Sequence, residues 1–171
     1  TFFLTVIFDL TVAIEVGLLI ACVLFMKRVM ETTEISVIRD EIDPNKESDL
    51  EVHEEHLTLP KGVEVYEING PYFFGIATKF EEIMSQLGDR PKIRIIRMRK
   101  VPFIDSTGIH NLTNLCVMSQ KENIHIILSG VNDKVHKVLE RSGFYELLGE
   151  ENICSNINEA VAKAWESVEK K

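Results

Sequence analysis

The chain has 171 residues, of which 45% are hydrophobic, and a formal net charge of -8. That length suffices for one ordinary domain plus an appendage, and the composition is that of a globular core. Its three cysteines are far apart and form no CxxC pair, which argues against a disulfide framework and a zinc site. The acidic balance gives no reason to expect a nucleic-acid-binding protein.

Residues 1–26 are almost entirely apolar and are followed at once by Lys27 and Arg28. Because about 20 apolar residues span the hydrocarbon of a bilayer, residues 1–30 are predicted to be a terminal transmembrane segment. The stretch lacks a basic start and a cleavage site, so it is not a signal peptide. The basic pair predicts that the chain after it lies in the cytoplasm. Since the chain begins with Thr, we expect a fragment of a longer protein.

Two acidic residues, Asp9 and Glu15, lie inside this apolar stretch. Acids within a membrane are usually functional or line a polar interior. Alternatively, the helix breaks near Asp9 and only residues 12–26 insert deeply, which leaves both acids near an interface. The sequence keeps both interpretations open.

The whole excess of negative charge falls in residues 31–60, which hold ten acidic residues against two basic ones. Part of this stretch, residues 43–61, is predicted to be a solvated acidic loop. It contains His53 and His56, whose spacing of three differs from the i, i+4 spacing of zinc proteases. We therefore expect solvated side chains there and no metal site.

Strand and helix patterns alternate along the rest of the chain. Apolar–polar alternation and short apolar runs predict strands over residues 35–42, 63–68, 93–98 and 124–128. Apolar residues at helical spacing predict helices over residues 75–87, 106–120, 132–143 and from about 156 onward. The basic residues of 92–100 are interpreted as the edges of a strand. This order is typical of an α/β domain with parallel strand pairs covered by helices.

The segment between the strand at 93–98 and the helix after it, residues 101–108, reads VPFIDSTG. Its carboxylate and hydroxyls fall at a helix start, where they cap free N–H groups and where an anion is stabilised. In the simplest interpretation, Asp105 or Ser106 caps the helix and Gly108 permits close packing at its first turn. A further interpretation adds a role as phosphoacceptor or docking surface.

No catalytic constellation accompanies this segment. The sequence contains no P-loop, GxGxxG or GxSxG motif. Ser106 and His110 are four apart on one predicted helix, but no orienting group or oxyanion site is visible. We expect no enzyme and no cofactor, a hydrogen-bonded strand histidine at His125, and a packing role for Trp165.

The segment VPFIDSTG resembles the signature loop of STAS domains, the fold of bacterial anti-sigma-factor antagonists and of the cytoplasmic tails of SulP anion transporters. The similarity continues through RMRKVPFIDSTGIHNL, a strand followed by Gly-Val-Asn, LERSGF and the last helix, and covers residues 35–171. Residues 6–17, VIFDLTVAIEVG, resemble the end of the SulP membrane domain. Because both halves occur in the right order, the chain is identified as the C-terminal end of a SulP-type transporter.

The resemblance implies an α/β STAS fold in residues 31–171, with a central mixed sheet of about four strands and helices packed on it. It implies a multi-pass protein of the cell (inner) membrane that transports sulfate or a related anion. The present part would then be a non-enzymatic, cytoplasmic regulatory and interaction domain. In the antagonists the serine after the loop aspartate is phosphorylated, which makes Ser106 the candidate phosphoacceptor, although SulP tails often lack a serine there.

The predicted regulatory and partner-docking residues belong to this loop and to the helix that it opens. They are Asp105, Ser106, Thr107, Gly108, His110 and Asn111. The implied partners are the membrane domain of the same transporter, a second copy in a homodimer and a cytoplasmic regulatory protein. The alternative function is a soluble antagonist-like phosphoswitch, which would explain Ser106 but leaves residues 1–26 unexplained.

Overall fold

The computed structural model describes residues 10–31, 33–39, 41–42, 57–73, 80, 83 and 90–169. Contacts between residues divide the chain into two compact units, Thr1–Thr33 and Glu34–Lys171. His53 and His56, which were expected to be solvated, lie outside the described residues, as do Asp9 and most of the predicted acidic loop.

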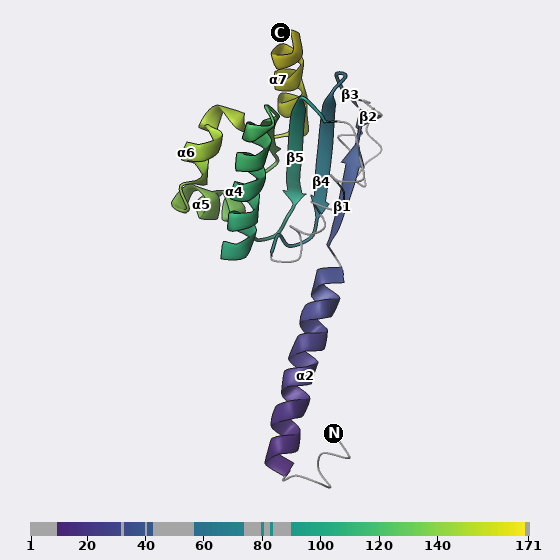
Figure 1. Ribbon diagram of the computed structural model, residues 1–171, viewed down its shortest axis with the longest axis vertical. Helices are drawn as coiled ribbons and strands as arrows, with labels where there is room; N and C mark the ends of the chain where they lie inside the picture. Colours follow the sequence, from purple (N-terminus) through teal and green to yellow (C-terminus); the bar gives the residue numbers. More distant parts are fainter. Residues whose placement is uncertain are drawn as a thin grey trace. The chain divides into compact units, whose positions relative to one another are not determined.

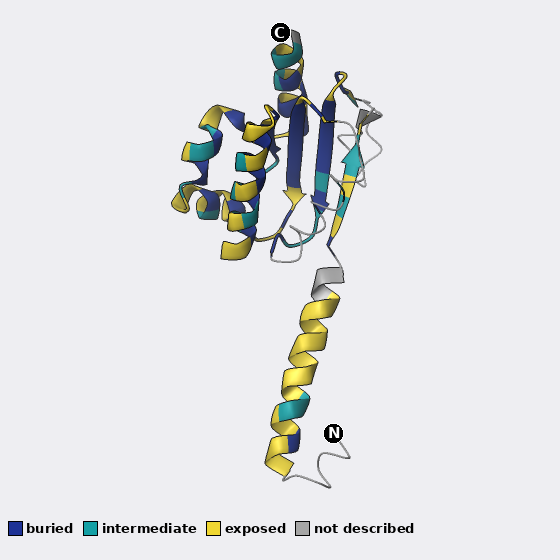
Figure 2. Ribbon diagram, viewed as in Figure 1, coloured by how far each residue is buried: buried dark blue, intermediate teal, exposed yellow. Residues whose placement is uncertain are grey.

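The described part of the first unit is dominated by one long helix, α2 (Leu10–Glu31), seen in Figure 1. Within the described ranges, its stretch Leu10–Arg28 is the one helical segment long and apolar enough to cross a membrane. Figure 2 shows that almost all of the described side chains on this helix are exposed. Glu15 is exposed as well, whereas Ala13 is buried. A helix that is apolar all round is typical of lipid or protein surroundings rather than water.

The second unit is built on a five-stranded mixed sheet in the order β1-β4-β5-β6-β7. The strands are β1 (Glu34–Ile38), β4 (Val63–Asn69), β5 (Ile93–Lys100), β6 (His125–Ser129) and β7 (Ile153–Cys154). Strand β1 pairs antiparallel with β4, and every other neighbouring pair is parallel. The carboxyl ends of the four parallel strands therefore meet at one edge of the sheet.

Helices cover both faces of this sheet, as Figure 1 shows. The helices are α4 (Ser106–Lys121), α5 (Asp133–Arg141), α6 (Phe144–Leu148) and α7 (Ile157–Glu169), with a short 3-10 turn, η1 (Glu150–Asn152), before β7. Successive side chains of a strand point to opposite faces. In β4, Tyr66 and Ile68 therefore enter the core beneath α4, α5 and α6, while Val63 and Val65 enter the core beneath α7.

The predicted α/β fold with a mixed sheet is confirmed, and the strands and helices predicted after residue 90 lie within about two residues of those observed. The predicted helix over 75–87 lies outside the described residues, except for Phe80 and Ile83. The sheet has five strands rather than about four. Two-residue β7 was missed because so short an edge strand shows no periodicity.

The single strand predicted over 35–42 is wrong. Strand β1 ends at Ile38, and β2 (Glu41–Ile42) pairs with β3 (Leu57–Thr58) in a separate two-stranded sheet. The interruption falls at Arg39, whose guanidinium lies 2.7 Å from the carboxylate of Glu64 on β4. The alternation of apolar and polar residues carries no information about an ion pair between two strands. It therefore could not predict where β1 ends.

The prediction that the basic residues of β5 lie at the strand edges is wrong for two of them. Arg94 and Arg97 are only 5% and 6% exposed. Each lies opposite a glutamate of β4 in the parallel register, Arg94 beside Glu64 and Arg97 beside Glu67. Because β5 is a central strand, its arginines can be buried only where the neighbouring strand supplies negative charge.

Candidate functional site

The loop between β5 and α4 lies at the carboxyl edge of the sheet. Val101 is fully buried directly after β5, and its N–H donates to the carbonyl of Met98 at 3.0 Å. Ile104 is buried too, whereas Phe103 between them is 52% exposed. The loop is therefore anchored by two apolar side chains and presents a third to the surface.

The backbone of this loop is bonded to the segment that follows β4. The Tyr72 N–H donates to the Phe103 carbonyl at 3.0 Å, and the Asp105 N–H donates back to the Tyr72 carbonyl at 3.3 Å. Tyr72 is 1% exposed, and burial holds the pKa of its phenol well above the usual range. A buried, uncharged anchor of this kind fixes the position of the loop.

Asp105 caps helix α4. Its Oδ1 accepts the Gly108 N–H at 2.6 Å, and its backbone is extended, as is usual for an N-cap. Gly108 is buried against Tyr72: a Cβ at this position would collide with the Tyr72 carbonyl oxygen and lie 2.9 Å from Ile104 Cγ1. The capping interpretation is confirmed, with Asp105 rather than Ser106 as the cap, and so is the close packing of Gly108.

The remaining predicted residues form an exposed rim on the first turns of α4. Ser106, Thr107 and His110 are exposed, and Asn111 is half-buried. The Asp105 carboxylate is occupied by the helix backbone, so the groups available to a partner are the Ser106 and Thr107 hydroxyls and the part of the exposed His110 ring that is not bonded to Asn114. Ser106 is the first residue of α4, where the helix dipole favours added negative charge.

Asn132 caps helix α5 and also joins this loop to that helix. Its Oδ1 accepts the N–H groups of Lys134 and Val135, both at 3.0 Å, while its Nδ2 donates to the Val101 carbonyl. Neither this contact nor the Tyr72 anchor has a local signal in the sequence, because each joins residues about thirty positions apart.

Neither a metal-binding cluster nor a reactive thiol accompanies this loop in the described residues. They contain no group of three or more His, Cys, Asp or Glu side chains that could hold a metal ion. The His110 Nε2 lies 3.1 Å from the Asn114 amide, so the ring is engaged with the next turn of its own helix. Burial raises the pKa of the Cys116 thiol to about 12, which keeps it protonated and unreactive.

Two side chains that the sequence singled out have simple structural roles. His125 Nε2 lies 3.0 Å from Asn152 Oδ1, which confirms the predicted hydrogen-bonded strand histidine. Trp165 is 42% exposed, and its indole N–H donates to the Thr58 carbonyl at 3.3 Å. The expected packing role is therefore not what the structure shows: Trp165 is an exposed residue of α7 that a hydrogen bond joins to β3.

The sequence profile of the STAS domain family matches residues 56–160, which contain the whole of this loop. This chain belongs to the STAS domain family. A crystal structure described as a sulfate transporter family protein from Wolinella succinogenes is 41% identical to it, with a TM-score of 0.64. The similarity covers 75% of this chain and 99% of that one. The predicted resemblance and STAS fold are confirmed, and the domain is of the type found in SulP transporters.

Other similarities extend further toward the N-terminus. Sulfate transporter 1.1 of Arabidopsis thaliana is 29% identical over 175 residues, covering 94% of this chain and 26% of that protein. The chain spans about a quarter of the length of the curated relatives that it matches. The murine anion transporter Slc26a9, at 17% identity and a TM-score of 0.68, shares the fold over 96% of this chain and 27% of its own.

These relatives are parts of membrane transporters, which supports association of the STAS domain with a membrane domain. Anti-sigma factor antagonists are also among the solved structures of the same fold, at low sequence identity.

Proposed function

We propose that residues 31–171 form a cytoplasmic regulatory and interaction domain of a SulP-type secondary anion transporter, and that the loop at Ser106 is its docking surface. The observation that carries this proposal is the division of labour within the loop. Asp105, Gly108 and Tyr72 fix its backbone, while Ser106, Thr107 and His110 remain exposed. A rigid backbone that presents free polar groups is what a reusable recognition surface requires.

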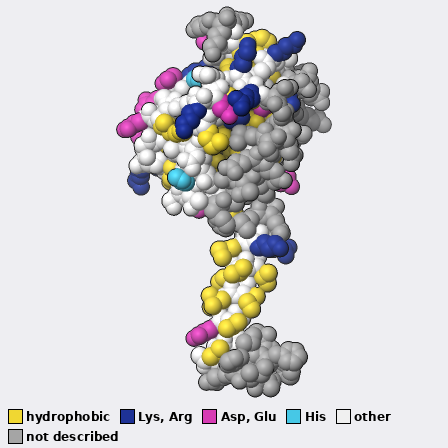
Figure 3. Space-filling view, viewed as in Figure 1, with side chains coloured by type: hydrophobic (Ala, Val, Ile, Leu, Met, Phe, Trp, Pro, Cys, Tyr) yellow, Lys and Arg dark blue, Asp and Glu magenta, His cyan; other side chains and the backbone are white. Residues whose placement is uncertain are grey.

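The proposed membrane segment is residues 1–30, the last span of the transporter. Support comes from α2, whose apolar stretch is followed by Lys27 and Arg28. Figure 3 shows Lys and Arg side chains gathered at one end of this helix. Basic residues next to a span favour the cytoplasmic side, so the chain after them would lie in the cytoplasm. We propose a homodimeric transporter, with anion transport itself carried out by the membrane domain upstream.

A phosphate on Ser106 would change the docking surface without unfolding the domain. It would add about two negative charges at the start of α4, a site that the helix dipole favours. Within α4 itself the first turn contains no acidic side chain, so the carboxylate beside the phosphate would be that of the N-cap Asp105, which the Gly108 N–H already engages. The surface seen by a partner would thus change from uncharged hydroxyl groups to a strongly negative group while the Asp105 cap stays in place.

The test uses the complete transporter. We expect Ser106→Asp to change anion uptake or capture of a regulatory protein, with the melting temperature of the protein shifted by only about 2 °C or less. The matched control is Ser155→Asp, an exposed serine close to the start of another helix, α7, which should leave uptake unchanged. Unchanged uptake and binding in Ser106→Asp and in Asn114→Lys, which introduces a charge on the same helix, would refute the docking role. A large loss of stability in Ser106→Asp would make Ser106 structural.

The second candidate is a soluble phosphoswitch like the anti-sigma factor antagonists, which share the fold. The exposed serine after the loop aspartate favours it. The length and apolar surface of α2 oppose it, because a soluble switch would have to shield that helix from water.

A further inference from the structure

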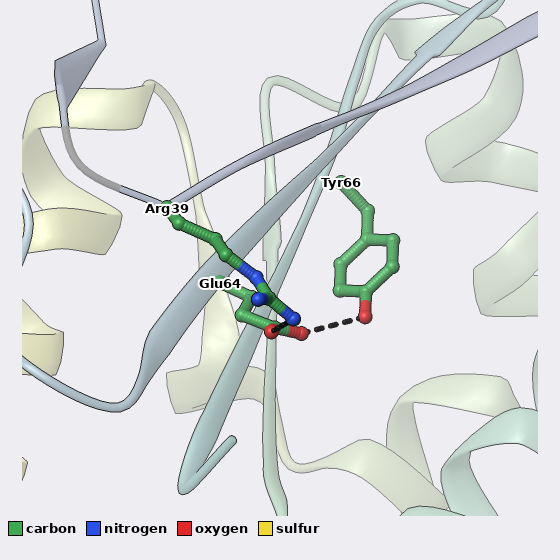
Figure 4. A network of polar contacts seen from close by, with 3 residues as sticks. All are labelled: Arg39, Glu64 and Tyr66. Atoms are coloured by element: carbon green, nitrogen blue, oxygen red, sulfur yellow. Dashed lines mark hydrogen bonds and ion pairs between the residues drawn. The ribbon is translucent and has the colours of Figure 1, made fainter. Parts of the chain in front are cut away.

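A buried network of charged and polar groups lies at the amino ends of β4 and β5, far along α4 from the Ser106 loop. Its centre is Glu64, which is 5% exposed. One carboxylate oxygen of Glu64 lies 2.7 Å from the Arg39 guanidinium, and the other accepts a hydrogen bond from the Tyr66 hydroxyl at 2.7 Å. Figure 4 shows both contacts as dashed lines. Both oxygens of a buried carboxylate are thus satisfied, one of them from β4 and the other from the end of β1.

Arg94 extends this network to helix α4. It lies opposite Glu64 in the register of β4 and β5, and its guanidinium sits 5.3 Å from the centre of the Tyr66 ring. Its Nη1 donates to the Ser119 hydroxyl at 2.8 Å. Ser119 is buried in the last turn of α4, so this bond joins β5 to the helix whose first turn carries Ser106.

The network is one hydrogen bond short. In the described part of the chain, the Nε of Arg94 is buried and has no hydrogen-bond partner. An unpaired buried donor is costly, and this one belongs to the cation that is the register neighbour of Glu64. If Arg39 left Glu64, the carboxylate would lose a charged partner in a buried site, and Arg94 has the spare donor to replace it.

We propose that this network is a two-position switch that couples strand β1 to helix α4. With Arg39 on Glu64, Arg94 holds Ser119 and the last turn of α4. With Arg39 withdrawn, Arg94 turns to Glu64 and releases Ser119. Helix α2 ends at Glu31, and β1 begins at Glu34. A displacement of the chain at the point where it leaves the proposed membrane segment would therefore be transmitted along β1 to Arg39.

The switch has two distinct positions because the guanidinium is a rigid plane. While Nη1 bonds to Ser119, Nε reaches no acceptor, so bringing Nε to Glu64 has to move the plane and draw Nη1 away from Ser119. Its consequence for regulation rests on the proposed function, since it acts on the helix that bears the docking loop. It would let the membrane domain alter the docking surface from the opposite end of α4, and by reciprocity let a docked partner favour one position of β1.

Hydrogen exchange of the whole chain in detergent micelles tests the coupling. We expect Arg39→Gln to make the amides of residues 118–123 exchange about tenfold faster, because the last turn of α4 loses the Arg94 bond. Ser119→Ala should produce a similar increase by itself. Combining the two changes should add little to either, which is the signature of one shared contact.

Glu67→Gln is the matched control. Glu67 lies on the same strand as Glu64 and pairs with Arg97 of β5 at 3.2 Å, but both of these side chains belong to the opposite face of the sheet from α4. This variant should leave exchange at 118–123 unchanged. An equal increase with Glu67→Gln, or none with Arg39→Gln, would overturn the switch. If Arg39→Gln does not fold, Arg39→Lys should give a smaller increase at the same amides, and no increase would overturn the proposal equally.

Uptake by the complete transporter separates this inference from the proposed function. Faster exchange together with altered uptake in Arg39→Gln supports both. Faster exchange with unaltered uptake supports the switch and counts against a regulatory role for α4. Unchanged exchange refutes the switch whatever uptake does, and leaves the Ser106 test to decide the docking role by itself.

Discussion

The two ends of the sheet in this STAS domain use polar side chains in opposite ways. At the carboxyl edge, Asp105 and Asn132 bond to backbone groups, and the side chains beside them, such as Ser106, stay exposed. At the amino end, Glu64 and Arg94 are buried and bond to side chains of other elements. Capping satisfies the backbone hydrogen-bonding groups of a loop and leaves its other side chains exposed for recognition. A buried side-chain network instead fixes strands and helices to one another and exposes no group to a partner.

The largest effect on stability is expected from a substitution in the buried network at the amino end of the sheet. Arg94→Met removes the cation that contacts Tyr66 and Ser119 and leaves the Ser119 hydroxyl buried without its donor. Removing one charged member of a buried ionic network lowers the free energy of unfolding by about 3 kcal/mol. We expect a loss of that size in urea unfolding of the detergent-solubilised chain, followed by far-ultraviolet circular dichroism. A loss below about 1 kcal/mol would mean that the network contributes little to stability.

A smaller loss is expected at the carboxyl edge from Gly108→Ala. The added methyl group would meet the backbone carbonyl of Tyr72, which cannot turn away because it accepts the Asp105 N–H. Overpacking of this kind costs about 2 kcal/mol. Thr107→Ala, one position earlier and exposed, is the control and should change the free energy of unfolding by less than about 0.5 kcal/mol. Equal stability of the two variants would show that the loop can move away from Tyr72.

Sequence reasoning was sound where a feature is local. The periodicity of residues 106–120 predicted α4, and residue type predicted the cap at Asp105 and the packing of Gly108. The Tyr72 and Asn132 contacts were beyond reach, because they depend on how strands separated by a crossover come together. The docking role of the loop stays a prediction.

The buried charges were missed although the sequence contains a signal for them. Glu64 and Glu67 are three apart in β4, and Arg94 and Arg97 are three apart in β5. In a parallel register two such spacings bring each glutamate beside an arginine, on opposite faces of the sheet. Reading the basic residues of β5 as strand edges overlooked this match, because each strand was considered without its neighbour.

The smallest effect on stability comes from the cap itself. Asp105→Ala removes the acceptor of the Gly108 N–H, and loss of an N-cap costs about 1 kcal/mol. Asp105→Asn keeps an oxygen acceptor and should recover most of that loss. The unfolding free energies of the two variants, measured side by side, test this difference.

Because the first turn of α4 frays without its cap, Asp105→Ala should also lower the affinity of the Ser106 surface for its regulatory partner. This loss of affinity should be larger than the loss of stability alone accounts for. If Asp105→Asn were as damaging to stability as Asp105→Ala, the carboxylate charge rather than the hydrogen bond would hold the turn, and the contrast between a capped edge and a charged interior would not stand.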